Sequence, residues 1–208
     1  MKKNNLGYIW EFYKWQILAV GVAAVLGIYL LCVALLKKEC ALFVMLLDCH
    51  TNVSQEQMEQ ELLQALQLDQ KEYTVSVQNE LMISDTDGGT YAMTSLSRFL
   101  SDVGSEKLDV CGMLEYDFLK YDASNTFLDL RECLDETQLQ NLDDSLLVTE
   151  DGRIAGIYAD GLPGMKKDGC YDAAGSRGVV GVVYNTKHID AAGAYLTYLM
   201  EGSSTILL

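Results

Sequence analysis

The pattern of hydrophobic positions begins with one long apolar run. Residues 17–36 contain no charged residue and no proline. A helix rises ~1.5 Å per residue, so this run can span the roughly 30 Å hydrocarbon layer of a membrane. Aromatic residues crowd the segment before the run, and Lys37 and Lys38 follow it. Because such side chains settle at the membrane surface, the pattern predicts a single transmembrane helix at residues 17–36.

The flanks of this run predict how the chain is oriented. Three lysines precede the run, against two that follow it, which slightly favours a cytoplasmic position for residues 1–16. The run is longer than the apolar core of a cleaved secretory signal, and no small-residue cleavage site clearly follows it. We therefore expect an uncleaved signal anchor in the cell membrane, with residues 39–208 in an extracytoplasmic domain.

Within residues 39–208, apolar segments alternate between strand and helix periodicity. The strand-like segments are "ALFVMLLD" from Ala41, "YTVSVQNELMI" from Tyr73, Leu108 to Leu114, and "GVVGVVYN" from Gly178. Continuously apolar strands are typical of sheets that are covered on both faces. Helical stripes are predicted from Ser54, from Tyr91 and from Lys187, the last of them ending at Gly202.

This alternation predicts an α/β fold, with a mainly parallel sheet and helices on both faces. Its most specific consequence is that Val44, Val110 and Val182, in three different strands, lie side by side. Residues 130–177 depart from the alternation, because they contain a short acidic helical segment and then two strands around Asp151 and Gly152. An Asp-Gly pair between two strands predicts a hairpin. We interpret this region as a small hairpin-containing insertion, followed by a glycine-rich loop over residues 161–177.

Charge divides the chain at the end of the apolar run. Residues 1–38 hold five of the 15 basic residues and one of the 30 acidic residues. Residues 39–208 therefore carry ten basic against 29 acidic residues, a net charge of −19. Such a domain repels nucleic acid, which we exclude as a partner, and it repels anionic headgroups. The charge fits a solubilising surface or, as the alternative, an acidic face for a cation or a basic partner.

Six cysteines are present, and five of them follow the apolar run: Cys40, Cys49, Cys111, Cys133 and Cys170. No pair has the spacing of a redox motif or a zinc site. If Cys40 and Cys49 flank one extended strand, nine residues of ~3.3 Å place them roughly 30 Å apart, beyond the reach of a disulfide. A bond from Cys111 to Cys133 or Cys170 stays open, and buried free thiols are the default expectation.

Candidate binding residues follow from the strand ends. Ligands of open α/β sheets gather beyond the carboxyl ends of the strands. The polar residues that come there in this sequence are Asp48, Asp85, Glu115, Tyr116 and Asn185. Glu115 and Asp117 could act as an acid/base pair, but they also fit an ordinary acidic first turn of a helix, and the sequence leaves the two readings open.

The motifs that would indicate an enzyme are missing from the sequence. There is no GxSxG elbow and no glycine-rich phosphate loop. Cys49 and His50 are adjacent, so on an extended chain their side chains point in opposite directions. The "DTDGG" segment resembles the start of a calcium loop, but Thr90 and Leu96 stand where glycine and glutamate are needed. We therefore expect no catalytic residues, no metal and no cofactor.

Two stretches resemble type 2 periplasmic-binding-protein folds, the extracellular solute-binding proteins. They are "LDVCGMLEYDFLKYDASNTFLDLRECL" and "GVVGVVYNTKHIDAAGAYLTYLMEG". The aromatic-rich start "YIWEFYKWQIL" is similar to membrane-anchored proteins of Gram-positive bacteria. The resemblance covers most of residues 41–202 and implies a solute-binding fold outside the membrane, often working beside a transporter.

The chain departs from that family in size. Only about 60 residues separate Glu115 from the returning strand near Gly178, too few for a second lobe of usual size. The expectation is a reduced domain whose strand-end residues line an open rim. The predicted function is a membrane-anchored binding or accessory module, associated with a transporter or another membrane complex. The alternative is a structural or assembly subunit of a membrane complex that binds no small molecule.

Overall fold

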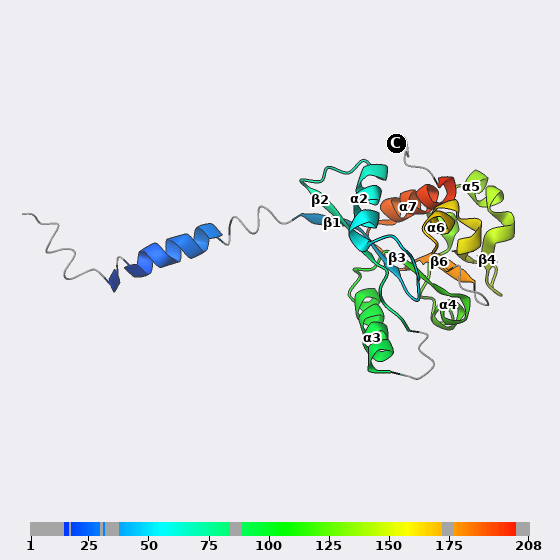
Figure 1. The fold of residues 1–208 in the computed structure, drawn as a ribbon, viewed down its shortest axis with the longest axis horizontal. Coiled ribbons are helices and arrows are strands. Elements are labelled where there is room, and N and C mark those ends of the chain that lie inside the picture. Colours follow the sequence, from blue (N-terminus) through cyan, green and yellow to red (C-terminus); the bar gives the residue numbers. More distant parts are fainter. Residues whose placement is uncertain are drawn as a thin grey trace, which may run out of the picture. The chain divides into compact units, whose positions relative to one another are not determined.

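The computed structural model describes residues 15–16, 18–29, 31, 38–83, 89–171 and 177–202. The chain divides into two compact units, Met1–Lys38 and Glu39–Leu208. Residues 15–16, 18–29 and 31 of the first unit are helical (Figure 1). No helix in the described part of the chain combines the length and apolar character that a membrane crossing requires. Ile17, Leu30 and residues 32–36 of the predicted transmembrane helix lie outside the described residues, as do residues 1–14.

A six-stranded sheet forms the centre of the second unit, in the order β2-β1-β3-β6-β5-β4. The strands are β1 (Glu39–Leu46), β2 (Tyr73–Gln78), β3 (Val110–Leu114), β4 (Leu146–Val148), β5 (Ile154–Tyr158) and β6 (Gly178–Val182). Val44 pairs with Val110, and Val110 pairs with Val182. The predicted side-by-side placement of these three valines is confirmed.

The sheet is mixed, so the prediction of a mainly parallel sheet is wrong. Strand β1 runs parallel to β2 and to β3. Strand β6 runs antiparallel to both of its neighbours, and β4 runs antiparallel to β5. An apolar strand buried between two helical layers has the same composition in either direction, so the residues of β6 do not encode its direction.

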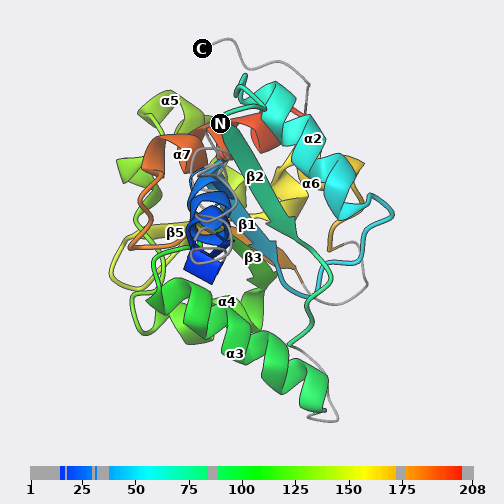
Figure 2. The ribbon, with the colours of Figure 1, turned by 90° about the vertical axis from the view of Figure 1, so that its left-hand side faces the viewer.

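Helices cover both faces of this sheet, as predicted (Figure 2). One face carries α2 (Gln55–Ala65), α5 (Glu136–Asn141), α6 (Pro163–Lys167) and α7 (Ile189–Glu201). Met58, Leu139, Met165 and Leu196 from these helices share one buried cluster. The other face carries α3 (Thr90–Gly104) and α4 (Glu115–Asp122), whose Phe99 and Phe118 belong to a second cluster.

The region predicted as an insertion contains the expected hairpin and one unexpected helix. Strands β4 and β5 pair around Gly152, which has a φ of +83°. Helix α6 lies inside the segment predicted as a loop, with Pro163 in its first turn. Proline suits that position because the first turn needs no N–H donor. Short 3₁₀ turns, η1 (Leu130–Glu132), η2 (Asp143–Ser145) and η3 (Ala159–Gly161), complete the region.

Local signals explain where the helices of this domain begin and end. The Ser54 hydroxyl accepts the N–H of Gln57 at 3.3 Å and caps α2. Asp135 and Gln138 form a reciprocal capping box at the start of α5. Gly202 ends α7 with a φ of +60°, a conformation that glycine adopts without strain.

Candidate functional site

The carboxyl ends of three parallel strands meet at one edge of the sheet. Strands β1, β2 and β3 end there at Leu46, Gln78 and Leu114. Two predicted site residues, Asp48 and Glu115, follow the ends of β1 and β3. Burial and the negative charge of Asp48 raise the pKa of Asp117, which lies in α4. The structure therefore brings these carboxylates to one edge, as the sequence predicted.

Asp48 has a structural role at this edge. It is 5% exposed and has a φ of +57°. Its backbone N–H donates to the Leu81 carbonyl at 2.9 Å. Its Oδ1 accepts the N–H of Ile83 at 3.0 Å. Asp48 thus fastens the segment after β2 to the end of β1.

Glu115 also makes structural contacts. Its Oε1 accepts the hydroxyl of Tyr158 at 2.6 Å, and its N–H donates to the Arg177 carbonyl at 2.9 Å. Burial and the Glu115 contact raise the pKa of Tyr158 to about 12. The Arg177 guanidinium lies 3.6 Å from the centre of the Tyr158 ring and pairs with Asp160 at 2.7 Å. The carboxylate thus joins α4 to β5, and the backbone N–H joins α4 to the residue before β6. Neighbouring Tyr116 is 79% exposed.

The remaining predicted site residues lie elsewhere. Asn185 follows β6, and because β6 is antiparallel to β3, Asn185 lies at the opposite edge of the sheet. Its Nδ2 donates to the Val103 carbonyl at 2.9 Å, at the end of α3. The expectation that Asn185 joins the others at one rim is therefore wrong. Asp85 lies outside the described residues.

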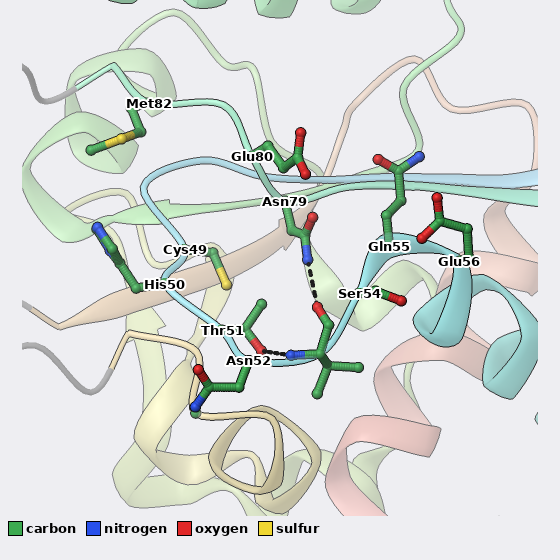
Figure 3. A pocket seen from close by; sticks show the side chains of 12 residues that line it. Cys49, His50, Thr51, Asn52, Ser54, Gln55, Glu56, Asn79, Glu80 and Met82 are labelled. Carbon is green, nitrogen blue, oxygen red and sulfur yellow. Dashed lines mark hydrogen bonds between the residues drawn. The ribbon is translucent and has the colours of Figure 1, made fainter.

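Sequence reasoning missed a hollow at the ends of β1 and β2 (Figure 3). It encloses about 870 Å³. Three segments supply its lining: residues 49–56 between β1 and the first turn of α2, residues 79–82 after β2, and Gly169. Its lining residues are Cys49, His50, Thr51, Asn52, Val53, Ser54, Gln55, Glu56, Asn79, Glu80, Met82 and Gly169.

Hydrogen bonds fix the shape of this hollow. Asn79, which is buried, donates from Nδ2 to the Val53 carbonyl at 3.3 Å, and so joins the end of β2 to the loop before α2 (Figure 3). Within that loop the Val53 N–H donates to the Thr51 hydroxyl at 3.2 Å. The Thr51 hydroxyl in turn donates to the Asp168 carbonyl after α6. These bonds hold one polar wall of the hollow in place.

The lining chemistry suits a small polar molecule. Six of the twelve lining residues carry amide, hydroxyl or imidazole groups, which can both donate and accept hydrogen bonds. Two carboxylates, Glu56 and Glu80, stand at the hollow, and the first turn of α2 presents backbone N–H groups. One signal of this site was present in the sequence, because Asn79 directly follows the strand segment "YTVSVQ" and is the polar strand end that the prediction passed over.

A buried polar centre at the opposite edge does a different job. Asp109 is 1% exposed and accepts the Phe43 N–H at 2.8 Å and the Thr186 hydroxyl at 2.5 Å. Nδ1 of His188 lies 3.1 Å from the same carboxylate. These contacts join β1, the start of β3 and the segment before α7, and they give His188 an aspartate partner. Among the described residues, no group of three or more His, Cys, Asp and Glu side chains could hold a metal ion.

Comparisons with protein-family models, with curated proteins and with solved structures found no match.

Proposed function

We propose that this chain is a membrane-anchored, extracytoplasmic binding module that takes a small polar solute in the hollow at the ends of β1 and β2. The observation that carries the proposal is the hollow itself, about 870 Å³ in volume and lined mainly by hydrogen-bonding groups. Ligand sites of α/β sheets lie beyond the carboxyl ends of strands, and this hollow has that position.

The chemistry of the lining supports solute binding over catalysis. The two predicted acid groups at this edge, Asp48 and Glu115, hold backbone and side-chain partners of the fold. The neighbouring Cys170 thiol and burial both raise the pKa of Cys49 well above its usual range. A thiol with a raised pKa is a poor nucleophile at neutral pH. A protein that delivers a solute to a transporter or senses it needs to bind the solute but not to react with it. The hydrogen-bonding groups of the hollow support binding of this kind.

The membrane attachment in this proposal depends on the sequence. Residues 17–36 are apolar throughout, with aromatic residues before them and lysines after them. The net charge of −19 on residues 39–208 keeps that domain away from anionic headgroups. We assign the domain to the outer side of the cell membrane, where a solute would reach the hollow directly.

A thermal-shift panel on the full chain in detergent tests this proposal. Unfolding is followed by circular dichroism with amino acids, sugars and divalent cations. At 100 times its Kd, a ligand stabilises by ~2.7 kcal/mol, which raises the Tm by roughly 5 to 10 °C. We expect one class to give this shift and Asn52→Tyr, in the hollow, to remove it. Asn141→Tyr, an exposed control at the end of α5, retains the shift.

The second candidate, an assembly subunit without a small ligand, is favoured by a different surface. The outer faces of α3 and α4 expose large apolar side chains: Met93, Leu100, Tyr116 and Leu119. Phe99 in α3 and Tyr121 in α4 pack edge to face, with their ring centres 5.1 Å apart. Exposed apolar groups on neighbouring elements are typical of protein interfaces. A panel in which no class shifts the Tm would favour this candidate.

A further inference from the structure

Two segments that are far apart in the sequence are fastened together beside the hollow. The Tyr171 hydroxyl donates to the Leu47 carbonyl at 2.9 Å. Four residues further along the first segment, the Thr51 hydroxyl donates to the Asp168 carbonyl. Each segment carries one cysteine between its two anchoring residues: Cys49 in the first and Cys170 in the second.

The clasp brings the two cysteines close together, because hydrogen bonds join their segments on either side of them. In agreement with this, the neighbouring Cys170 thiol is the first cause of the raised pKa of Cys49. Both side chains are buried, and both belong to the hydrophobic cluster under α2 and α7. The contact is therefore enclosed by the packed core and is held by hydrogen bonds on each side.

The other described cysteines have no such partner. Cys111 belongs to the cluster on the other face of the sheet. The Cys133 thiol donates to the Leu130 carbonyl at 3.6 Å, and Cys40 is exposed at the start of β1. The pairings considered from the sequence, Cys111 with Cys133 or with Cys170, would have to cross the sheet. Within residues 38–83, 89–171 and 177–202, the geometry favours one pair.

We propose that Cys49 and Cys170 form a disulfide bond as the domain folds outside the membrane. Thiol–disulfide exchange supplies the oxidant: a dithiol–disulfide oxidoreductase or an oxidised low-molecular-weight thiol, R–S–S–R, takes up the two electrons. One Cys sulfur attacks R–S–S–R and releases RSH, and the second Cys then displaces the other RSH. Two thiols become one cystine and one disulfide becomes two thiols, so atoms and electrons balance.

The location of the bond gives it a function in the binding site. Cys49 and Gly169, the neighbour of Cys170, both line the hollow. A bond here would join the loop between β1 and α2 to the turn after α6, and so would fix one wall of the site. It would also close a loop across residues 50–169, most of the domain. Long closed loops restrict the unfolded chain most, so the bond stabilises the fold.

The buried position also predicts when the bond forms. The raised pKa of Cys49 and its burial keep it from reacting in the folded, reduced protein. Exchange therefore takes place during folding, before the core closes. This inference rests on the proposed extracytoplasmic location only for the source of the oxidant, whereas the pairing rests on the geometry of the clasp.

Peptide mapping tests the pairing and the location separately. Full-length Cys40→Ser protein is taken from native membranes and, in parallel, is synthesised in detergent with oxidised and reduced glutathione. Both samples are denatured in N-ethylmaleimide and cut with trypsin. Peptide 39–71 then holds Cys49 as its only cysteine, and peptide 168–177 holds Cys170. We expect these two peptides to be linked in both samples, while Cys111 and Cys133 carry the reagent.

The outcomes are distinct. A link only in the glutathione sample supports the pairing and contradicts the extracytoplasmic location. Peptides 39–71 and 168–177 that both carry N-ethylmaleimide in the glutathione sample overturn the pairing, as does a link from either peptide to Cys111 or Cys133.

A reductant melt adds a second readout. Dithiothreitol should lower the Tm of Cys40→Ser by about 10 °C, and leave the Tm of a further Cys49→Ser, Cys170→Ser variant unchanged. A Tm that does not respond to reductant in Cys40→Ser contradicts the bond. If the further variant does not fold, the peptide map still decides.

Discussion

An ion pair inside the fold gives a sharp stability prediction. Arg153, at the start of β5, lies 3.2 Å from the Asp122 carboxylate at the end of α4. Its Nη1 also donates to the Phe127 carbonyl at 3.1 Å. The Asp122 side chain is 6% exposed and that of Arg153 is 24% exposed. The guanidinium therefore joins the hairpin to α4 through a carboxylate that is almost fully buried.

The cost of Arg153→Met follows from this burial. At an effective dielectric constant of about 20, charges ~3.2 Å apart attract by roughly 5 kcal/mol, and desolvation of the arginine offsets part of this. Removing one partner leaves the Asp122 carboxylate buried, which typically costs 3 to 5 kcal/mol. Since Arg153 keeps some access to water, we expect a loss of about 3 kcal/mol in the free energy of unfolding.

Lys187→Met supplies the matched control. Lys187 and Glu106 are closer, at 2.8 Å, but their side chains are 63% and 49% exposed. An exposed pair contributes about 0 to 1 kcal/mol because water screens it. The two variants are compared by urea unfolding followed by circular dichroism, with the slope checked for two-state behaviour. Arg153 also pairs with the exposed carboxylate of Asp151 at 2.8 Å, the same distance as in the control pair. Distance alone therefore predicts similar losses for the two variants, whereas burial predicts the larger loss for Arg153→Met.

A second change completes this test. Adding Asp122→Leu to Arg153→Met removes the stranded carboxylate, and an apolar replacement of a buried pair is often close to neutral. We expect the double variant to regain most of the lost stability. Equal losses in Arg153→Met and Lys187→Met, or a double variant less stable than Arg153→Met, would refute the reasoning.

Two further predictions concern packing and pH. A Cβ at Gly181 would lie 2.7 Å from the buried Phe118 ring and 2.8 Å from the Ala155 carbonyl, whereas one at Gly104 meets nothing within 4 Å. Gly181→Ala should therefore lower the free energy of unfolding by about 1 to 3 kcal/mol, and Gly104→Ala should raise it by up to ~1 kcal/mol. Urea unfolding measures both changes. Similar values for the two variants would contradict the packing. Burial, and then the charge of Asp48, raises the pKa of Asp117. The native state therefore binds the carboxyl proton of Asp117 more tightly than the unfolded chain does. For this reason the stability of the fold falls as the pH rises through the raised pKa. Asp117→Asn should be more stable than the parent at pH ~7 and lose this advantage by pH ~3; a constant difference across pH would contradict the assignment.

The sequence was sufficient to predict the layers of the fold. Continuous apolar segments marked β1, β3 and β6, and helical stripes marked α2, α3 and α7. The pairing of Val44 with Val110 and of Val110 with Val182 followed from the same reasoning. Strands buried on both faces and helices buried on one stripe have different periodicities, which is why these elements could be distinguished.

Strand direction was beyond the sequence. The chain enters β6 antiparallel to β3 after passing through the hairpin and α6. Nothing in "GVVGV" differs between the two directions, because both faces are buried in either case. This one reversal moved Asn185 from the predicted rim to the far edge, beside the Val103 carbonyl.

The candidate site was predicted in position but not in composition. The carboxyl edge of β1, β2 and β3 was expected to hold the ligand, and the hollow lies there. The acids chosen from the sequence, Asp48 and Glu115, proved to hold the fold together. Charge at a strand end does not reveal whether a carboxylate points to solvent or to backbone N–H groups. The clasp between Cys49 and Cys170 depends on contacts across more than a hundred residues, which spacing alone does not encode.

Hydrogen–deuterium exchange on the full chain in detergent tests solute binding in the hollow most directly. Backbone exchange is compared without ligand and with each class of the solute panel. Binding in the hollow predicts slower exchange in residues 49–56 and 79–82 together, with no change around Asn185 at the far edge. Protection confined to α3 and α4, or none with any class, would contradict it.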